Sequence, residues 1–295
     1  MSIKIIQERL NSYHSTSEQE EENALREIAQ EVVLGGLSRA GFFKVAGFHG
    51  GTSLRILYSL QRFSEDLDFT LVQQKDDFRL DRYLRGLQDE LTAFGFEFHI
   101  IDKNKMDQTV CKQFLKDDSL ARLLTFDHLK PGRDTRSIRI KIEVDTNPPP
   151  GSDFEVKFHD FPFPYEIAVQ DLPSLFAGKN HALLCRPFVK GRDWYDFVWY
   201  VSRDVPINFK YLSAAINQLG PWQGQAIPVD KNWYLQQMKE RIESLDFDQA
   251  RDDVKRFIKP ADLPSLDLWS TEFFLDRLSK LNREQRPHSN SSEEN

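Results

Sequence analysis

Gly50–Phe69, with the sequence GGTSLRILYSLQRFSEDLDF, is the stretch around which the chain is organised. A Gly-Gly pair opens it, a short amphipathic run follows, and an acidic segment closes it. On a strand, side chains alternate between faces, so Asp66 and Asp68 point one way and Leu67 and Phe69 the other. Two carboxylates on one face repel each other unless a cation lies between them, and carboxylate oxygens suit Mg²⁺. The acidic segment therefore predicts a metal site.

The start of the same stretch indicates a phosphate site. A turn at Gly50 and Gly51 lets backbone N–H groups approach a phosphate closely. Thr52 and Ser53 can cap the helix that follows, and the N-terminus of a helix favours an anion. The alternative is a surface hairpin with solvated acids, because neither motif is specific alone. Their combination, in this order, favours a nucleotide–metal site.

Composition limits the class of protein. The chain has 295 residues, which is enough for two domains, and its 40% hydrophobic content indicates a globular protein. Cys111 and Cys185 form no zinc or redox motif, which fits a reducing cytoplasm. We expect no membrane partner, because no apolar run approaches about 18 residues and no signal peptide is evident. The net charge of −7 argues against non-specific coating of nucleic acid, but a local basic face leaves RNA open as a substrate.

Hydrophobic patterns on both sides of the stretch predict alternating helices and strands. Residues 103–135 favour no single structure, although KDD at 116–118 and the turn at 131–133 indicate irregular chain. The predicted elements are a helix over 17–35 capped by Ser17, a strand over 42–48, a helix over 77–94 ended by Gly95, a strand over 96–101, a strand over 137–145, and an edge hairpin within 154–169.

The predicted strand over 137–145, SIRIKIEVD, offers a third carboxylate. Its apolar residues take one face and its charged residues the other. A two-metal site needs such a group in addition to the aspartate pair. Glu143 and Asp145 face the same way, so spacing alone does not choose between them. The alternative is an ordinary polar face on which Lys141 pairs with Glu143.

GGTSL…RFSEDLDF resembles the signature of the AbiEii/AbiGii and MenT-like nucleotidyltransferase toxins, within the polymerase-beta-like nucleotidyltransferase superfamily. The stretch DTNPPPG at 145–151 also recurs in that group. The resemblance implies an α+β protein in which a mixed sheet flanked by helices is followed by a C-terminal helical domain. We expect a nucleotidyltransferase domain at 1–170, a helical domain completing the active site at 171–283, and a disordered tail at 284–295. The resemblance favours Glu143 over Asp145.

A second signature lies in LFAGKNHALLCR and KGRDWYDFVWYV, which resemble the family's helical Lys followed by Arg-Asp-x-x-Asp. Lys179 would neutralise triphosphate charge, and Asp193 or Asp196 would orient it or hold substrate. Arg192 and Asp196 are four residues apart and can pair on a helix. The alternative is an interdomain salt-bridge cluster.

The resemblance implies transfer of a nucleoside monophosphate from NTP to an acceptor, which is tRNA in relatives, with Mg²⁺ or Mn²⁺ as cofactor. It also implies a toxin of the phage-defence type, opposed by a cognate antitoxin. The family often has Lys where this chain has His49, which puts a charge contact to phosphate from that position in doubt. The expected site residues are catalytic Asp66, Asp68, Glu143, Asp145 and Lys179; nucleotide-binding Gly50, Gly51, Thr52, Ser53, Ser64, Lys179, Asp193 and Asp196; and metal-binding Asp66, Asp68 and Glu143.

Three alternatives stay open. A nucleotidyltransferase of this fold could modify a small molecule, which the acidic net charge mildly favours, or a protein. A non-catalytic nucleotide-binding module is the third, although every expected acidic position is present in the chain.

Overall fold

The structure is a computed structural model that describes residues 2–75, 77–101, 119–127 and 137–282. The chain packs as two compact units. The first runs to Leu175 and also includes Arg256–Ala261, and the second comprises Phe176–Lys255 and the chain from Asp262 onward. The boundary predicted between residues 170 and 171 lies just before helix α5 (Leu172–Cys185), whereas the division between the units falls within that helix.

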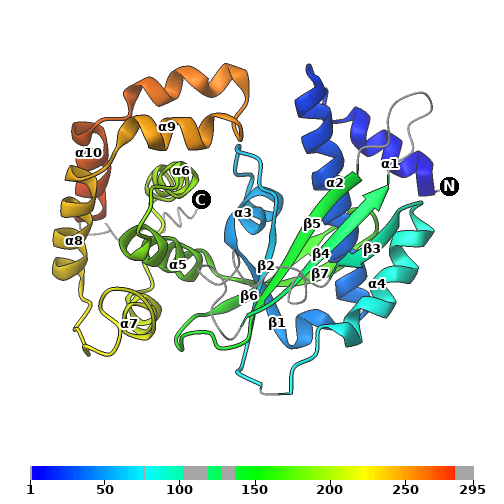
Figure 1. Ribbon diagram of the computed structural model, residues 1–295, viewed down its shortest axis with the longest axis horizontal. Helices are drawn as coiled ribbons and strands as arrows, with labels where there is room; N and C mark the ends of the chain where they lie inside the picture. The colour runs from blue at the N-terminus through cyan, green and yellow to red at the C-terminus, as the bar shows by residue number, and fades with distance from the viewer. Residues whose placement is uncertain (1, 76, 102–118, 128–136, 283–295) are drawn as a thin grey trace, which may run out of the picture. The chain divides into compact units, whose positions relative to one another are not determined.

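A mixed seven-stranded sheet forms the first unit over the described residues, with strand order β3-β4-β5-β2-β1-β7-β6 (Figure 1). The pairs β2–β5 and β1–β7 are parallel, and the other neighbouring pairs are antiparallel. The predicted α+β class is therefore confirmed. The strands are β1 (Ala46–His49), β2 (Leu67–Leu71), β3 (Glu97–Ile101), β4 (Ser119–Asp127), β5 (Ser137–Asp145), β6 (Phe154–His159) and β7 (Tyr165–Gln170).

Helices accompany the sheet in the first unit and follow it in the second, as predicted. Among the described residues, every helix is too short or too polar to cross a membrane. The other elements are α1 (Ser2–Asn11), α2 (Glu18–Arg39), η1 (Phe42–Lys44), α3 (Gly50–Tyr58), α4 (Asp81–Ala93), α6 (Gly191–Val201), α7 (Phe209–Gln218), α8 (Lys231–Glu243), α9 (Phe247–Lys255), η4 (Pro260–Leu268) and α10 (Thr271–Asn282).

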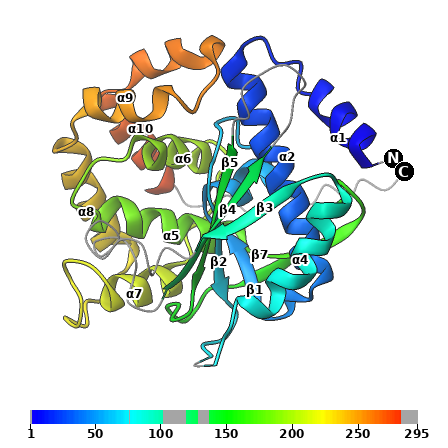
Figure 2. The same ribbon diagram turned by 45° about the vertical axis from the view of Figure 1, so that its right-hand side comes forward.

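The apolar face of the sheet packs against α2 and α4, which lie side by side (Figure 2). Phe42 links the layers, because its ring lies 4.9 Å from that of Phe69 on β2 and 5.2 Å from that of Tyr83 on α4. Phe48 on β1 and Val144 on β5 are completely buried on the same face. Because strand side chains alternate, this burial leaves the intervening polar residues on the opposite face.

Several predicted elements agree with the structure. Ser17 caps α2 by accepting a hydrogen bond from the Glu20 N–H, and the strand over 137–145 matches β5. The strand over 96–101 corresponds to β3, and the hairpin within 154–169 corresponds to β6 and β7, with β6 at an edge.

Other predictions are wrong in part. The strand predicted over 42–48 begins only at Ala46, because Gly41 is in the left-handed region and Phe42–Lys44 forms a 3-10 turn. The helix predicted over 77–94 begins at Asp81, and α1 and β4 were not predicted. The irregular segments predicted at 116–118 and 131–133 and the tail at 284–295 lie outside the described residues.

Candidate active site

The register between β2 and β5 determines how the acidic residues meet. Leu67 pairs with Ile142 and Phe69 with Val144, and all four are completely buried. Asp68, between the two buried β2 residues, pairs with Glu143, and register partners on parallel strands share a face. The Asp68 and Glu143 side chains therefore lie next to each other on the polar face. Asp66 immediately precedes the first residue of β2.

Asp145 has a different neighbour. It pairs in register with Thr70, and its Oδ1 accepts a hydrogen bond from the Asn147 N–H at 3.1 Å. The carboxylate of Asp145 thus supports the turn that ends β5. Sequence spacing did not distinguish Glu143 from Asp145. The backbone register does, because it sets Glu143 beside Asp68.

A lysine lies among the acidic residues. The Lys141 Nζ is 2.5 Å from Glu143 Oε2, so the pairing that the sequence offered as an alternative is present. Burial acts to lower the pKa of the Lys141 ammonium, but nearby negative charge, chiefly that of Glu143, raises this pKa above its ordinary value. Asp66 and Asp68 also contribute to the rise, so the field of all three carboxylates acts on this one cation.

The described residues contain no group of three or more Asp, Glu, His or Cys side chains arranged to hold a metal ion. The chemistry of the donors nevertheless fits Mg²⁺, which takes carboxylate oxygens. A cation already lies at this place, because the Lys141 ammonium contacts Glu143. Asp66 and Asp68 would hold a metal ion, joined by Glu143 once its carboxylate leaves Lys141.

Gly50 and Gly51 lie directly against the acidic segment. Gly50 has φ +81°, and a Cβ atom there would lie 2.6 Å from Asp68 Oδ2. A Cβ on Gly51 would lie 2.5 Å from an Arg62 nitrogen and 2.9 Å from Ser64 Oγ. Only glycine avoids these clashes, and only glycine adopts the Gly50 conformation without strain. The two ends of the organising stretch thus form one site.

Thr52 and Ser53 do not cap α3, and that prediction is wrong. The helix already begins at Gly50, so both residues lie inside it and the N-cap position belongs to His49. The Thr52 hydroxyl donates to the backbone carbonyl of Asp66, and Ser53 donates to the carbonyl of Gly50 at 2.8 Å. The N-cap residue forms no side-chain capping bond. Thr52 therefore connects the glycine turn to the first aspartate.

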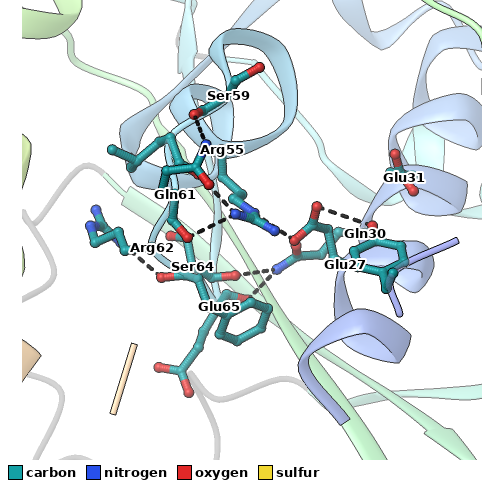
Figure 3. Close-up of polar contacts among 12 residues, drawn as sticks. Glu27, Gln30, Glu31, Arg55, Ser59, Gln61, Arg62, Ser64 and Glu65 are labelled. Carbon is teal, nitrogen blue, oxygen red and sulfur yellow. Dashed lines mark hydrogen bonds and ion pairs between the residues drawn. The ribbon is translucent and has the colours of Figure 1, made fainter. Parts of the chain in front are cut away.

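The loop before Asp66 is held by α2 (Figure 3). The Gln30 side-chain amide donates to the carbonyls of Ser64 at 3.1 Å and Glu65 at 2.9 Å. With the bond from Thr52 to Asp66, three consecutive carbonyls are each bound by a side chain. Gln30 is 1% exposed, and its own Oε1 has no hydrogen-bond partner among the described residues. A buried polar atom without a partner calls for an explanation. Here the explanation is the two hydrogen bonds that the Gln30 amide nitrogen donates to the loop.

Arg55 holds the earlier part of the loop. Its Nη1 donates to the carbonyls of Leu60 at 3.0 Å and Gln61 at 2.9 Å, while its Nε donates to Glu27 on α2 at 2.8 Å (Figure 3). We call Glu27, Gln30 and Arg55 the loop brace. Sequence reasoning missed it. The available signal was the presence of polar residues within the apolar stripe of α2.

The second signature forms an ion cluster in the second unit. The Lys179 Nζ lies 2.8 Å from Asp193 Oδ1 and 2.8 Å from Asp196 Oδ2. Arg186 also binds Asp193. Burial acts to raise the pKa of Asp193, but the positive charges of Lys179 and Arg186 hold it well below its ordinary value. Both aspartates are buried and position the lysine ammonium.

Arg192 and Lys190 flank this cluster. Arg192 Nε lies 4.0 Å from Asp253 Oδ2, while Asp196 is bound by Lys179. Burial lowers the pKa of Lys190 to about 8, although the negative charge of Asp193 opposes this shift.

Comparisons with known proteins show the fold and the family of this chain. The chain is similar to JHP933 from Helicobacter pylori, with 17% identity over 91% of this chain and 95% of that one, at a TM-score of 0.52. A second H. pylori protein, described as a candidate nucleotidyltransferase, has 15% identity over 87% of this chain and 97% of that one, at a TM-score of 0.46. No curated protein sequence matches. The family model for AbiEii, a nucleotidyl transferase toxin of type IV toxin–antitoxin systems, matches residues 32–277. The chain therefore belongs to the AbiEii family of nucleotidyl transferase toxins.

Proposed function

We propose that this toxin transfers a nucleoside monophosphate from NTP to tRNA with the help of Mg²⁺, or of Mn²⁺ in its place. One observation carries the proposal. Asp68 and Glu143 are register partners, with Asp66 just ahead and a glycine turn in contact with Asp68. This arrangement combines metal-binding carboxylates with a turn that a phosphate can approach.

In the first unit, different residues would bind the cation and the nucleotide phosphate. The carboxylates of Asp66, Asp68 and Glu143 hold the cation. The backbone at Gly50 and Gly51, at the N-terminus of α3, binds a phosphate of the nucleotide through N–H groups and the helix dipole. Bound Mg²⁺ supplies charge neutralisation at the triphosphate and lowers the pKa of the acceptor hydroxyl. Ser64, beside Gly51, completes the nucleotide-binding side.

Lys179 would supply positive charge for the triphosphate. Asp193 and Asp196 hold its ammonium in place, each at 2.8 Å. In this proposal the two aspartates are positioning residues. Their carboxylates are already engaged by Lys179, so we do not assign them a direct contact with the nucleotide.

Family membership supports the assignment of this protein as a toxin, and tRNA is the acceptor that the sequence resemblance implies. A cognate antitoxin follows from the same family, and the cysteine content fits the cytoplasm. A small-molecule or protein acceptor uses the same carboxylates, so the acceptor needs a direct assay. The non-catalytic alternative is disfavoured because all the acidic positions are present.

The test incubates purified protein with total RNA and each labelled NTP, with Mg²⁺, Mn²⁺ or a chelator. We expect label at tRNA size with one or more nucleotides, lost with the chelator and in Asp68→Asn. Asp89→Asn, at an exposed acid on α4, is the matched control that keeps activity. Label on the protein or on a small molecule from a cell extract would replace the tRNA assignment. No label with any acceptor would overturn the catalytic proposal.

A further inference from the structure

We propose that Lys141 is a built-in counter-ion of the carboxylate site, which holds Glu143 in the metal-free chain and must release it before Glu143 can join a bound metal ion. Lys141 is then a positioning residue that sets the metal affinity of the site. The proposal rests on the proposed function for the identity of the site as a metal site.

The geometry of the two strands carries this inference. Lys141 and Glu143 are two residues apart on β5, so both face the polar side of the sheet, and their charged atoms are 2.5 Å apart. Leu67 and Ile142 are the first register partners of the two strands, and Asp66 and Lys141 are the residues that precede them. Asp68 pairs with Glu143 one step further along the ladder.

The charges of this group explain why both a lysine and a metal ion suit it. Three carboxylates and one ammonium sum to −2, which one divalent cation neutralises. A metal ion must displace the contact of Lys141 with Glu143 to gain a third carboxylate.

Displacement has a direct cost for the metal. A cationic side chain within about 4–6 Å of a carboxylate lowers the affinity of that carboxylate for a proton by about 1–3 pKa units, or about ten- to a thousandfold. The same ammonium repels a divalent metal ion at least as strongly as it repels a proton. Metal alone should therefore bind weakly. The ammonium that leaves Glu143 is available to the nucleotide phosphates, so nucleotide favours the metal-bound state.

The chain provides a matched control on β6. Lys157 and Glu155 are also two residues apart on a strand, with Nζ and Oε1 3.2 Å apart. The two lysine side chains are similarly exposed, 35% for Lys157 and 33% for Lys141. Removing Lys157 thus repeats the loss of a strand lysine that pairs with glutamate, at a different place on the sheet.

The experiment titrates Mn²⁺ into nucleotide-free protein by calorimetry. We expect Lys141→Met to lower the Mn²⁺ Kd at least about tenfold, following the charge effect above. Lys141→Arg, which keeps the charge, and Lys157→Met should both bind Mn²⁺ as the wild type does. Asp68→Asn should lose binding. Thermal melts check the fold of each variant, and Lys141→Gln carries the same measurement if Lys141→Met does not fold.

Two results would overturn the inference. An unchanged Mn²⁺ Kd in Lys141→Met would mean that the lysine does not compete, and a weaker one would mean that it supports the metal. Either result, together with intact tRNA labelling, leaves the proposed function standing. Mn²⁺ binding that survives in Asp68→Asn would instead remove the metal site, and the proposed function with it.

Discussion

Asp68 on β2 and Glu143 on β5 are direct register partners, so the second aspartate of the acidic segment lies beside an acid about 75 residues later in the chain. The pairing depends on buried neighbours. Leu67 and Phe69 are completely buried, and a shift of one residue would turn Asp68 into the core. The core thus fixes the geometry of the site.

Replacing either aspartate should abolish nucleotide transfer and leave the fold intact. Asn keeps the shape of Asp but is a neutral, poorer ligand for Mg²⁺. For Asp66→Asn and Asp68→Asn we expect losses larger than the ~100-fold that removal of an outer-shell partner costs. Labelled-nucleotide transfer and a thermal melt measure the two effects. Near-normal activity in either variant would contradict the metal-site assignment.

Glu143→Gln and Asp145→Asn should differ. The register sets Glu143 beside Asp68, while Asp145 supports the turn after β5. Transfer should fall in Glu143→Gln as far as in Asp68→Asn, while Asp145→Asn, whose amide oxygen can still accept from the Asn147 N–H, should keep transfer near the wild-type rate. The reverse order of activities would make Asp145 the third carboxylate. Equal and mild effects would remove β5 from the site.

Lys179→Ala should lower transfer about ten- to a hundredfold, because charge-assisted contacts are worth about 1.5–3 kcal/mol. Lys179→Arg should restore activity only in part, since a guanidinium differs in shape from an ammonium. Steady-state transfer and thermal melts of both variants are the measurements. A much lower melting temperature with unchanged transfer per folded molecule would show that Lys179 serves only to pair Asp193 and Asp196.

Asp193 should make the second unit sensitive to acid. Its pKa is held below the ordinary value of 3.8, so the charged form contributes stability above that pH. This contribution is lost as the pH falls below 3.8, when the unfolded state takes up the proton first. Asp193→Asn should lose about 3–5 kcal/mol at neutral pH, the cost of breaking a buried ion pair. Denaturant unfolding at neutral pH and near pH 3 should show a smaller difference in acid. A difference that is constant with pH would contradict the assignment.

Gln30→Met should weaken both stability and transfer. It removes the Gln30 donor from the carbonyls of Ser64 and Glu65, which costs about 1–3 kcal/mol for a buried group, and it frees the chain next to Asp66. Gln170→Met is the control, because Gln170 is equally buried and its Nε2 has no partner among the described residues. That change should not lower the melting temperature. If Gln30→Met destabilised the protein without changing transfer per folded molecule, the loop brace would have no part in catalysis.

Local signals were enough to predict much of the first unit. The strict alternation of β5 predicted its limits, and the two motifs of the organising stretch do lie in contact through Gly50 and Asp68. The pairing of Lys141 with Glu143 also followed from their spacing. In each case the information lies within a few residues of one strand or turn.

What sequence could not predict depends on contacts between distant segments. Gln30 resembles a solvated helix residue until the loop that it binds is in place. α1 was missed, and in the structure its Arg9 pairs with the buried Glu31 of α2. Neither the loop that Gln30 binds nor the Glu31 partner of Arg9 can be identified from the local sequence pattern.

The loop brace also limits how this protein can change in length. Loops usually accept insertions and deletions because their backbone faces water. In the segment from Leu60 to Asp66, five of the carbonyls are bound by side chains of Arg55, Gln30 and Thr52. One added residue would shift every later carbonyl away from its donor and turn Asp68 from the site. The number of residues between the glycine turn and the aspartates is therefore as much a part of the active site as the acids themselves.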